Sequence, residues 1–100
     1  KSAEQGNRAS QNNMGFMYEI GRGVLKNYKV SASWYQKAAD AGSATAQVNL
    51  GIYYCNGKGV DKDLSMSKIL LLKAYESGDL TLSQQDWVEG VWERCKLANY

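Results

Sequence analysis

Side chains with catalytic potential are few in this 100-residue chain, which contains no histidine and ten acidic residues. Asp61 and Asp63 form a nearby carboxylate pair of the kind that can hold or transfer a proton. They directly follow a glycine-containing stretch, where the start of a helix favours acidic and capping residues. We therefore interpret both aspartates as structural, and we expect neither catalytic residues nor a bound cofactor.

Two four-residue segments combine glycines with a cation, as phosphate-binding loops do. They are Gly21–Val24 (GRGV) and Gly57–Val60 (GKGV). A P-loop has four residues between its first glycine and its Gly-Lys-Ser/Thr, and it follows a strand. Neither segment has that spacing, and the net charge of +2 is spread along the chain. We therefore expect no phosphate site and no nucleic-acid partner.

Cys55 and Cys95 are the two cysteines of the chain. A structural zinc site takes four ligands, so two thiols without histidine predict no metal site. The helices described below place Cys55 near the end of one helix and Cys95 late in a neighbouring one. A disulfide is one interpretation, and two free, partly buried thiols are the other. A bridge would indicate a periplasmic or secreted protein, and free thiols a cytoplasmic one.

The elements that position these residues form an internal repeat. Gly6, Gly42 and Gly78 are evenly spaced, 36 residues apart, and Gln11–Lys26 matches Gln47–Lys62 at the same offset. Random pairing would give identity at roughly one position in sixteen, so this register is real. A period of this length is typical of stacked supersecondary units that bury their apolar faces against one another.

Each unit is predicted to be a helical hairpin. Apolar and small residues recur at helical spacing on the first helices, at Ser10, Met14, Gly15 and Tyr18 and at Ala46, Leu50, Gly51 and Tyr54. The same pattern marks the second helices, at Ser31, Trp34, Tyr35 and Ala38 and at Ser67, Leu70, Leu71 and Ala74. Paired glycines end each first helix, and Asn27 and Asp63 are suited to cap each second helix.

The tail after the second unit predicts one further helix, capped by Thr81 or Ser83. Its apolar face would carry Trp87, Val88, Val91, Trp92 and Cys95. It lacks the glycine pattern, as expected of a helix that closes a stack. For its two tryptophans we favour packing over contact with a partner.

The predicted fold is therefore all-α, with helices at about 7–20, 27–41, 43–56, 63–77 and 81–98 and no strand. We interpret the chain as one domain, with residues 1–5 as the tail of a preceding repeat helix. Residues 6–41 and 42–77 are the two repeats, and residues 78–100 the capping helix. The longest strongly apolar run, Ile69–Leu72, is far shorter than the ~20 residues of a membrane span, so none is expected.

Several segments resemble the Sel1-like repeat family in period, glycine placement and second-helix motif. They are Ala3–Gly6 (AEQG), Met14–Tyr18, Gly21–Val24, Trp34–Gly42 (WYQKAADAG), Leu50–Tyr54 and Gly57–Val60. The resemblance covers about residues 1–78. Two departures concern the second helices, where Ser31 and Ser67 replace the family's small alanine and Leu70-Leu71 replaces its Trp-Tyr.

The resemblance implies an α/α solenoid related to tetratricopeptide repeats, whose first helices line a concave, protein-binding surface. The residues of that groove would be Asn12, Phe16, Glu19, Val48 and Ile52. Packing of Phe16 and Ile52 between hairpins is an equally weighted alternative. The implied function is a non-enzymatic adaptor or scaffold. The alternative is an immunity or inhibitor protein that neutralises a bacterial toxin or enzyme, and the resemblance identifies neither the partner nor the oligomeric state.

Overall fold

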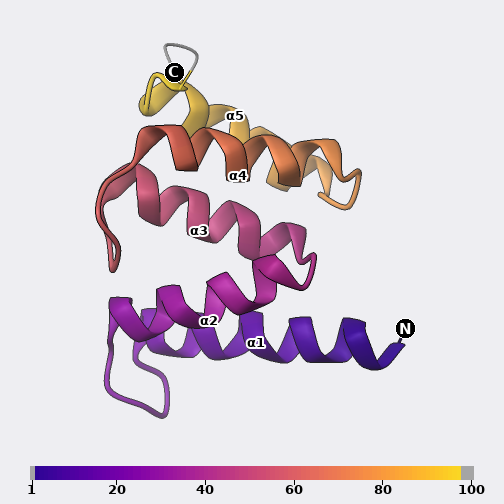
Figure 1. The fold of residues 1–100 in the computed structure, drawn as a ribbon, viewed down its shortest axis with the longest axis vertical. Coiled ribbons are helices and arrows are strands. Elements are labelled where there is room, and N and C mark those ends of the chain that lie inside the picture. The colour runs from indigo at the N-terminus through magenta and orange to yellow at the C-terminus, as the bar shows by residue number, and fades with distance from the viewer. Residues whose placement is uncertain (1, 98–100) are drawn as a thin grey trace.

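The computed structural model describes the backbone of residues 2–97 and the side chains of residues 9–97. Its five α-helices are α1 (Ser2–Ile20), α2 (Tyr28–Asp40), α3 (Ala44–Asn56), α4 (Leu64–Glu76) and α5 (Leu82–Arg94). No strand occurs between residues 2 and 97. Figure 1 shows α1 and α2 as one hairpin, α3 and α4 as the next, and α5 at the end of the stack. The predicted all-α solenoid is confirmed.

The predicted helix caps are also confirmed. The side chains of Asn27 and Asp63 each accept the backbone N–H three residues later, at 3.1 and 3.0 Å. At α5 the cap is Thr81 rather than the alternative Ser83, and Gln84 completes a capping box with it. These contacts satisfy N–H groups that a helix N-terminus otherwise leaves without partners.

Two predicted helix boundaries are wrong. α1 runs without a break from Ser2, so the helix begins before the predicted residue 7 and includes Gly6. Gly42 and Gly78 do follow the ends of α2 and α4, with φ values of 97° and 77°. Gly42 and Gly78 lie in turns that packed hairpins hold in place. Gly6 lies inside a helix, where a glycine lowers stability by only about 1 kcal/mol and is tolerated.

The second wrong boundary is the end of α5. The helix ends at Arg94 with Cys95 as its C-cap, earlier than the predicted residue 98, which lies outside the described residues. Lys96 then takes a φ of 53°, in the left-handed region. This turn directs Leu97, which is buried, back into the core.

The glycine-rich turn of the second hairpin packs against the first hairpin. Gly59 has a φ of 74°, and a side chain there would clash with the carbonyl oxygen of Tyr28. Lys58 lies above the same residue, with its Nζ 4.6 Å from the centre of the Tyr28 ring. The cation of the GKGV segment therefore stacks on an aromatic ring at the contact between hairpins.

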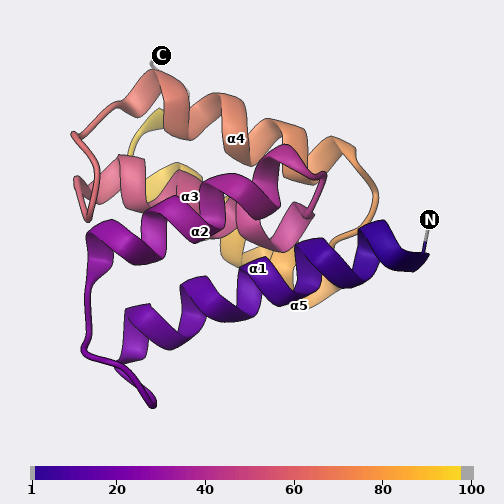
Figure 2. The same cartoon turned by 60° about the horizontal axis from the view of Figure 1, so that its bottom comes forward.

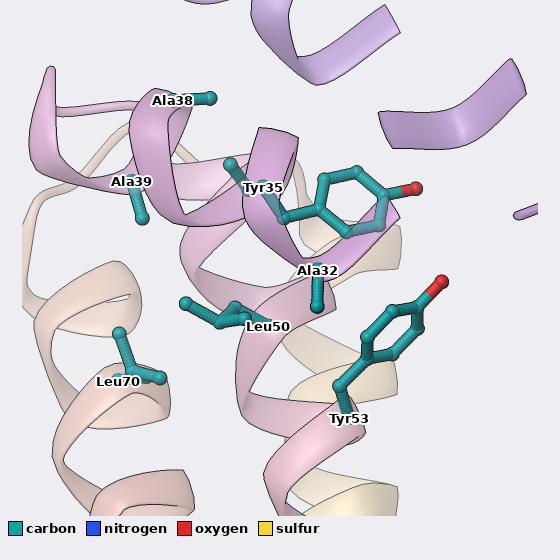
Figure 3. Close-up of a cluster of buried hydrophobic side chains, with 8 residues drawn as sticks. Ala32, Tyr35, Ala38, Ala39, Leu50, Tyr53 and Leu70 are labelled. Atoms are coloured by element: carbon teal, nitrogen blue, oxygen red, sulfur yellow. The ribbon is translucent and has the colours of Figure 1, made fainter. Parts of the chain in front are cut away.

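A first buried cluster joins the first hairpin to the second. Its members are Ala32, Tyr35, Ala38, Ala39, Ala46, Leu50, Tyr53 and Leu70, and Figure 3 shows most of them between α2, α3 and α4. The alanines of α2 let the next helix approach closely. The rings of Tyr35 and Tyr53 meet edge to face, with centres 5.5 Å apart, a favourable aromatic geometry.

A second buried cluster holds α5 on the second hairpin. It consists of Ala44, Val48, Leu71, Ala74, Leu80, Val88, Val91 and Leu97. Val88 and Val91 lie on the predicted inner face of α5, and Trp92 packs at the edge of the cluster. The capping helix is thus held mainly by aliphatic burial.

Candidate functional site

Side-chain hydrogen bonds link the first helices of successive units. Asn49 Nδ2 of α3 donates to Asn12 Oδ1 of α1 at 3.5 Å. Gln84 Nε2 of α5 donates to Thr45 Oγ1 of α3 at 3.2 Å. The helices α1, α3 and α5 are therefore neighbours along one side of the stack. In Figure 2, α4 lies at one edge of the view and α5 lies toward the edge occupied by α1.

Large apolar side chains are exposed on this side. Phe16 is 50% exposed and Ile20, one turn later on α1, is exposed as well. Trp87 of α5 is 45% exposed. Ile52 of α3 is half-buried and borders, with Trp87, a hollow of about 420 Å³.

Polar groups complete this surface. Asn56 and Arg94 border the same hollow as Ile52 and Trp87. We call the surface formed by Phe16, Ile20, Ile52, Asn56, Trp87 and Arg94 the first-helix face. It combines apolar anchors with an amide and a guanidinium, the composition of a protein contact.

The residues predicted to line the groove differ in exposure and in contacts. Phe16 is exposed, and Asn12 and Ile52 are half-buried. Glu19 is also half-buried and accepts a hydrogen bond from Tyr35 Oη at 2.7 Å, so its carboxylate is already engaged. The prediction for Val48 is wrong, because Val48 is 1% exposed and packs in the second buried cluster. The reason is that α5 covers the side of α3 that carries it.

Sequence reasoning missed four residues of the first-helix face. Ile20 follows Phe16 by four residues and so shares its side of α1. Asn56 follows Ile52 by the same interval on α3, and Arg94 follows Trp87 by two helical turns on α5. The packing interpretation holds for Trp92 and is wrong for Trp87, which α5 turns toward solvent. The helical interval from Phe16 was the one signal in the sequence that could have identified Ile20.

A buried polar network supports α1 and α3 behind this face. Ser31 Oγ donates to the Gly15 carbonyl oxygen at 2.6 Å and lies 2.8 Å from Tyr53 Oη. Burial raises the pKa of the Tyr35 hydroxyl, and its hydrogen bond to the Glu19 carboxylate raises that pKa further. Burial likewise raises the pKa of Tyr53, while the hydrogen bond with Ser31 acts in the opposite direction. Both phenols are therefore neutral donors at physiological pH.

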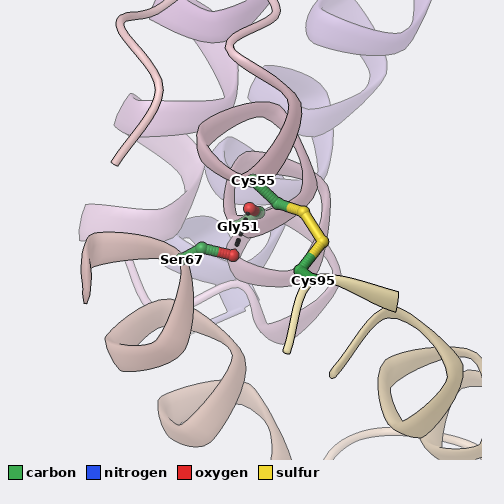
Figure 4. Close-up of a disulfide and its surroundings, with 4 residues drawn as sticks. All are labelled: Gly51, Cys55, Ser67 and Cys95. Carbon is green, nitrogen blue, oxygen red and sulfur yellow. Dashed lines mark hydrogen bonds between the residues drawn. A yellow bond between two sulfur atoms is a disulfide. The ribbon is translucent and has the colours of Figure 1, made fainter. Parts of the chain in front are cut away.

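The same contact recurs in the second hairpin, where Ser67 Oγ donates to the Gly51 carbonyl oxygen at 2.7 Å (Figure 4). The two serines that depart from the family's alanine are thus buried donors at a close helix contact. Alanine lacks the hydroxyl and therefore cannot make this bond. The sequence showed that Ser31 and Ser67 replace alanine, but it did not show the hydrogen bonds that the two serines make.

A disulfide between Cys55 and Cys95 borders the hollow of the first-helix face (Figure 4). Its Cα atoms are 6.3 Å apart, within the range that a disulfide spans. It joins the last turn of α3 to the C-cap of α5. The sequence left open whether Cys55 and Cys95 form a disulfide or stay as free thiols, and in the structure they form the disulfide.

Among the described residues, no three His, Cys, Asp or Glu side chains gather to hold a metal ion. None of the described helices is both long and apolar enough to cross a membrane.

Solved structures of two repeat proteins are similar to this chain. One is a Sel1 repeat protein from Oxalobacter formigenes, with 46% identity and a TM-score of 0.71, covering 73% of this chain and 30% of that one. The other is c5321, a protective antigen of uropathogenic Escherichia coli strains that displays an SLR fold. It has 42% identity and a TM-score of 0.71, covering 77% of this chain and 16% of that one. This chain therefore spans under a third of either relative.

No curated protein matches the sequence. The family model described as "Sel1 repeat" matches residues 8–43 and 44–79, which together make up more than half of the chain. The first matched segment contains α2 and most of α1, the second contains α3 and α4, and each includes one of the two glycine–serine contacts. The chain belongs to the Sel1 repeat family.

Proposed function

We propose that this chain is a non-enzymatic adaptor or scaffold that binds a segment of another protein along the first-helix face. Sel1 repeat proteins are generally protein–protein interaction modules. The observation that carries the proposal is the exposure of Phe16, Ile20 and Trp87 on the same side of the stack, on the first and last of three neighbouring helices. Apolar side chains grouped in this way mark contact surfaces.

The composition of the face suggests what it recognises. Phe16 and Trp87 are aromatic anchors, the type of residue that contributes most to binding when water is excluded around it. Arg94 and Asn56 lie together at the hollow and offer donors to a carboxylate or a main-chain carbonyl. We therefore expect a partner segment with apolar side chains followed by an acidic residue or a free carboxyl group.

The face is also held ready for binding without rearrangement. Hydrogen bonds tie α1 to α3 and α3 to α5, and the disulfide holds the end of α5 to α3. Such preorganisation reduces the entropy lost when the partner binds.

Site-specific photo-crosslinking tests this proposal. A photoreactive phenylalanine analogue at position 16 or 87 should capture the same protein in extracts of the source organism. The control position is Leu25, which is 90% exposed in the turn after α1 and is not one of the residues that define the face. Capture of that protein from position 25 alone would refute the proposed surface. The activity of the captured protein, measured with and without this chain, then separates a scaffold from an inhibitor.

A further inference from the structure

A second apolar surface lies on the other side of α5, against α4. A pocket of about 240 Å³ is lined there by Leu71, Leu72, Tyr75, Val88, Glu89 and Trp92. Small-molecule pockets are larger, at roughly 300–1,000 Å³. Leu72 and Tyr75 are exposed, so the pocket opens to solvent. It suits side chains presented by another surface better than an enclosed small ligand.

The internal repeat shows which element takes the equivalent place one unit earlier. α3 and α5 are both 13 residues long and follow equivalent caps, Ser43 and Thr81. Counted from these caps, Leu50, Gly51 and Tyr54 of α3 correspond to Val88, Glu89 and Trp92 of α5. The pocket between α4 and α5 is therefore bordered by the α5 counterparts of the family's Leu-Gly-x-x-Tyr motif.

On α3, that motif is covered by a helix. Leu70 of α4 shares a buried cluster with Leu50. Leu71 contacts Gly51, where an added methyl group would lie 3.0 Å from Leu71 Cδ2. No helix within residues 2–97 takes the corresponding place on α5. Within residues 2–97, the apolar lining of the pocket is therefore not covered by a helix.

The centre of this uncovered surface differs in charge from the equivalent position on α3. Glu89 stands where α3 has Gly51, and its Oε2 accepts a hydrogen bond from Tyr75 Oη at 3.0 Å. A glutamate side chain is larger than the hydrogen atom of glycine, so a helix packed here as closely as α4 packs on Gly51 would meet the Glu89 side chain. A helix that presents a cation to Glu89 would instead gain an ion pair.

Neighbouring charges at the rim favour the same chemistry. Asp86 and Glu93 are exposed on the side of α5 that carries Glu89, and Asp86 lies close enough to raise the pKa of Tyr75 together with Glu89. A cation at this surface is Lys68, whose Nζ lies 6.0 Å from the centre of the Trp92 ring. The side of α5 that borders the pocket itself carries three carboxylates, at Asp86, Glu89 and Glu93.

We propose that the pocket between α4 and α5 is a second docking site, which binds an amphipathic helix of a partner protein. The repeat equivalence indicates a helix, and the pocket lining requires apolar residues at i, i+3 or i+4, and i+7 on its bound face. The carboxylates of α5 require lysine or arginine beside that apolar stripe. The site is separate from the first-helix face, which lies on the other flank of α5.

Two helical peptides test this site. Both have the same pattern of leucines; in one the leucines are flanked by arginines, and in the other by glutamates. Each is titrated into the full chain labelled with ¹⁵N. The indole N–H signal of Trp92 should shift with the arginine peptide, while that of Trp87 stays in place as an internal control. The arginine peptide should bind at least about tenfold more tightly than the glutamate peptide, a difference of ~1.4 kcal/mol.

Matched variants decide which residues bind. Leu72→Ser should weaken binding by at least about tenfold, whereas Ile69→Ser, at a position 51% exposed on the same helix and outside the pocket lining, should not. Glu89→Gln should keep leucine-dependent binding and lose most of the preference for arginine. Thermal melts check that each variant is folded.

Three results would overturn the proposal: equal affinity for the two peptides, shifts at Trp87 instead of Trp92, or equal losses from Leu72→Ser and Ile69→Ser. Self-association that Leu72→Ser abolishes would assign the pocket to a second copy of the chain and would also overturn it. Sedimentation velocity over a range of protein concentrations makes that last measurement.

Discussion

Ser67 and Gly51 form the closest polar contact between α4 and α3: the serine hydroxyl donates to the glycine carbonyl oxygen at 2.7 Å. Ser31 and Gly15 repeat the contact in the first hairpin at 2.6 Å. In both hairpins the missing side chain of glycine brings the backbones close enough for the serine to reach a main-chain oxygen. Because these bonds are buried, they stabilise one rotation of each helix pair over others.

The two serines should differ in their contribution to stability. Ser67→Ala removes one hydrogen bond and should lower the free energy of unfolding by about 1 kcal/mol. Ser31→Ala should cost more, ~2 kcal/mol, because Tyr53 Oη also loses its partner at 2.8 Å. Urea denaturation of both variants measures the difference. Equal losses would show that the contact with Tyr53 adds nothing.

Alanine at the helical glycines should give three distinct results. A methyl group at Gly15 would lie 2.6 Å from Cδ1 of the buried Tyr35 ring, so Gly15→Ala should cost about 1–3 kcal/mol by overpacking. Gly51→Ala should cost less, because the flexible Leu71 side chain can move away. Gly90→Ala meets no atom within 4 Å and should stabilise α5 by up to about 1 kcal/mol. Differential scanning calorimetry tests this order, and a stabilising Gly15→Ala would contradict it.

The disulfide should stabilise the cap against separation from α3. Cys55 and Cys95 are 40 residues apart, and closing a loop of that size is worth roughly 2–4 kcal/mol. Reduction, or replacement of both cysteines by serine, should therefore lower Tm, and the two treatments should agree. Alkylation and mass spectrometry without reductant should find no free thiol in protein purified from its own compartment. Two alkylated cysteines would rule out the bridge there and favour a reducing compartment.

Stability should fall in alkaline solution because of two buried tyrosines. The pKa values of Tyr35 and Tyr53 are raised in the folded state, chiefly by burial, above the ordinary value of about 10 in the unfolded chain. Below about pH 10 both states hold the phenol protons, and the contribution of the tyrosines to stability is fully present. Above it the unfolded chain releases protons that the folded chain keeps, so the free energy of unfolding decreases.

Phenylalanine variants identify the groups responsible. Tyr35→Phe and Tyr53→Phe should each flatten the loss of stability between about pH 10 and pH 12. Tyr75→Phe is the comparison: the hydrogen bond to Glu89 also raises the pKa of Tyr75, but this phenol is exposed, so its removal should flatten the loss less than removal of a buried phenol. Denaturation curves recorded across this pH range make the comparison. An unchanged slope in both buried variants would assign the alkaline transition to other groups, such as lysines.

Binding at the first-helix face should depend on its aromatic anchors. Phe16→Ala or Trp87→Ala should each weaken partner binding by ~2 kcal/mol or more, about 30-fold in Kd, where the residue is a hot spot. Leu25→Ala, at an exposed position outside the face, should leave Kd unchanged. Ile52→Ala needs a parallel stability measurement, because Ile52 also packs on the second buried cluster. Isothermal titration calorimetry with the partner identified by crosslinking measures these Kd values. If the Phe16→Ala and Trp87→Ala variants are folded and bind with undiminished affinity, the first-helix face is not the binding surface.

Local patterns in the sequence determined the repeat, the hairpins and most helix boundaries. The 36-residue spacing of Gly6, Gly42 and Gly78 indicated the unit, and Asn27 and Asp63 indicated where the second helices begin. These features depend on a few neighbouring residues, since capping and glycine turns act within one helical turn. The exception is Gly6, whose local pattern matched the other two glycines without the packed hairpin that makes them helix ends.

Only the tertiary structure decided which apolar residues are available to a partner. Val48 is buried and Trp87 is exposed because α5 settles on one side of α3. The apolar pattern predicted that Val88 and Val91 face inward, as they do, but it could not show that Trp87, at the edge of that face, stays exposed. Glu89 shows the same dependence, since its carboxylate borders a pocket only because α4 packs beside α5. Exposure is a property of the whole set of packed helices, and it depends on contacts between residues far apart in the chain.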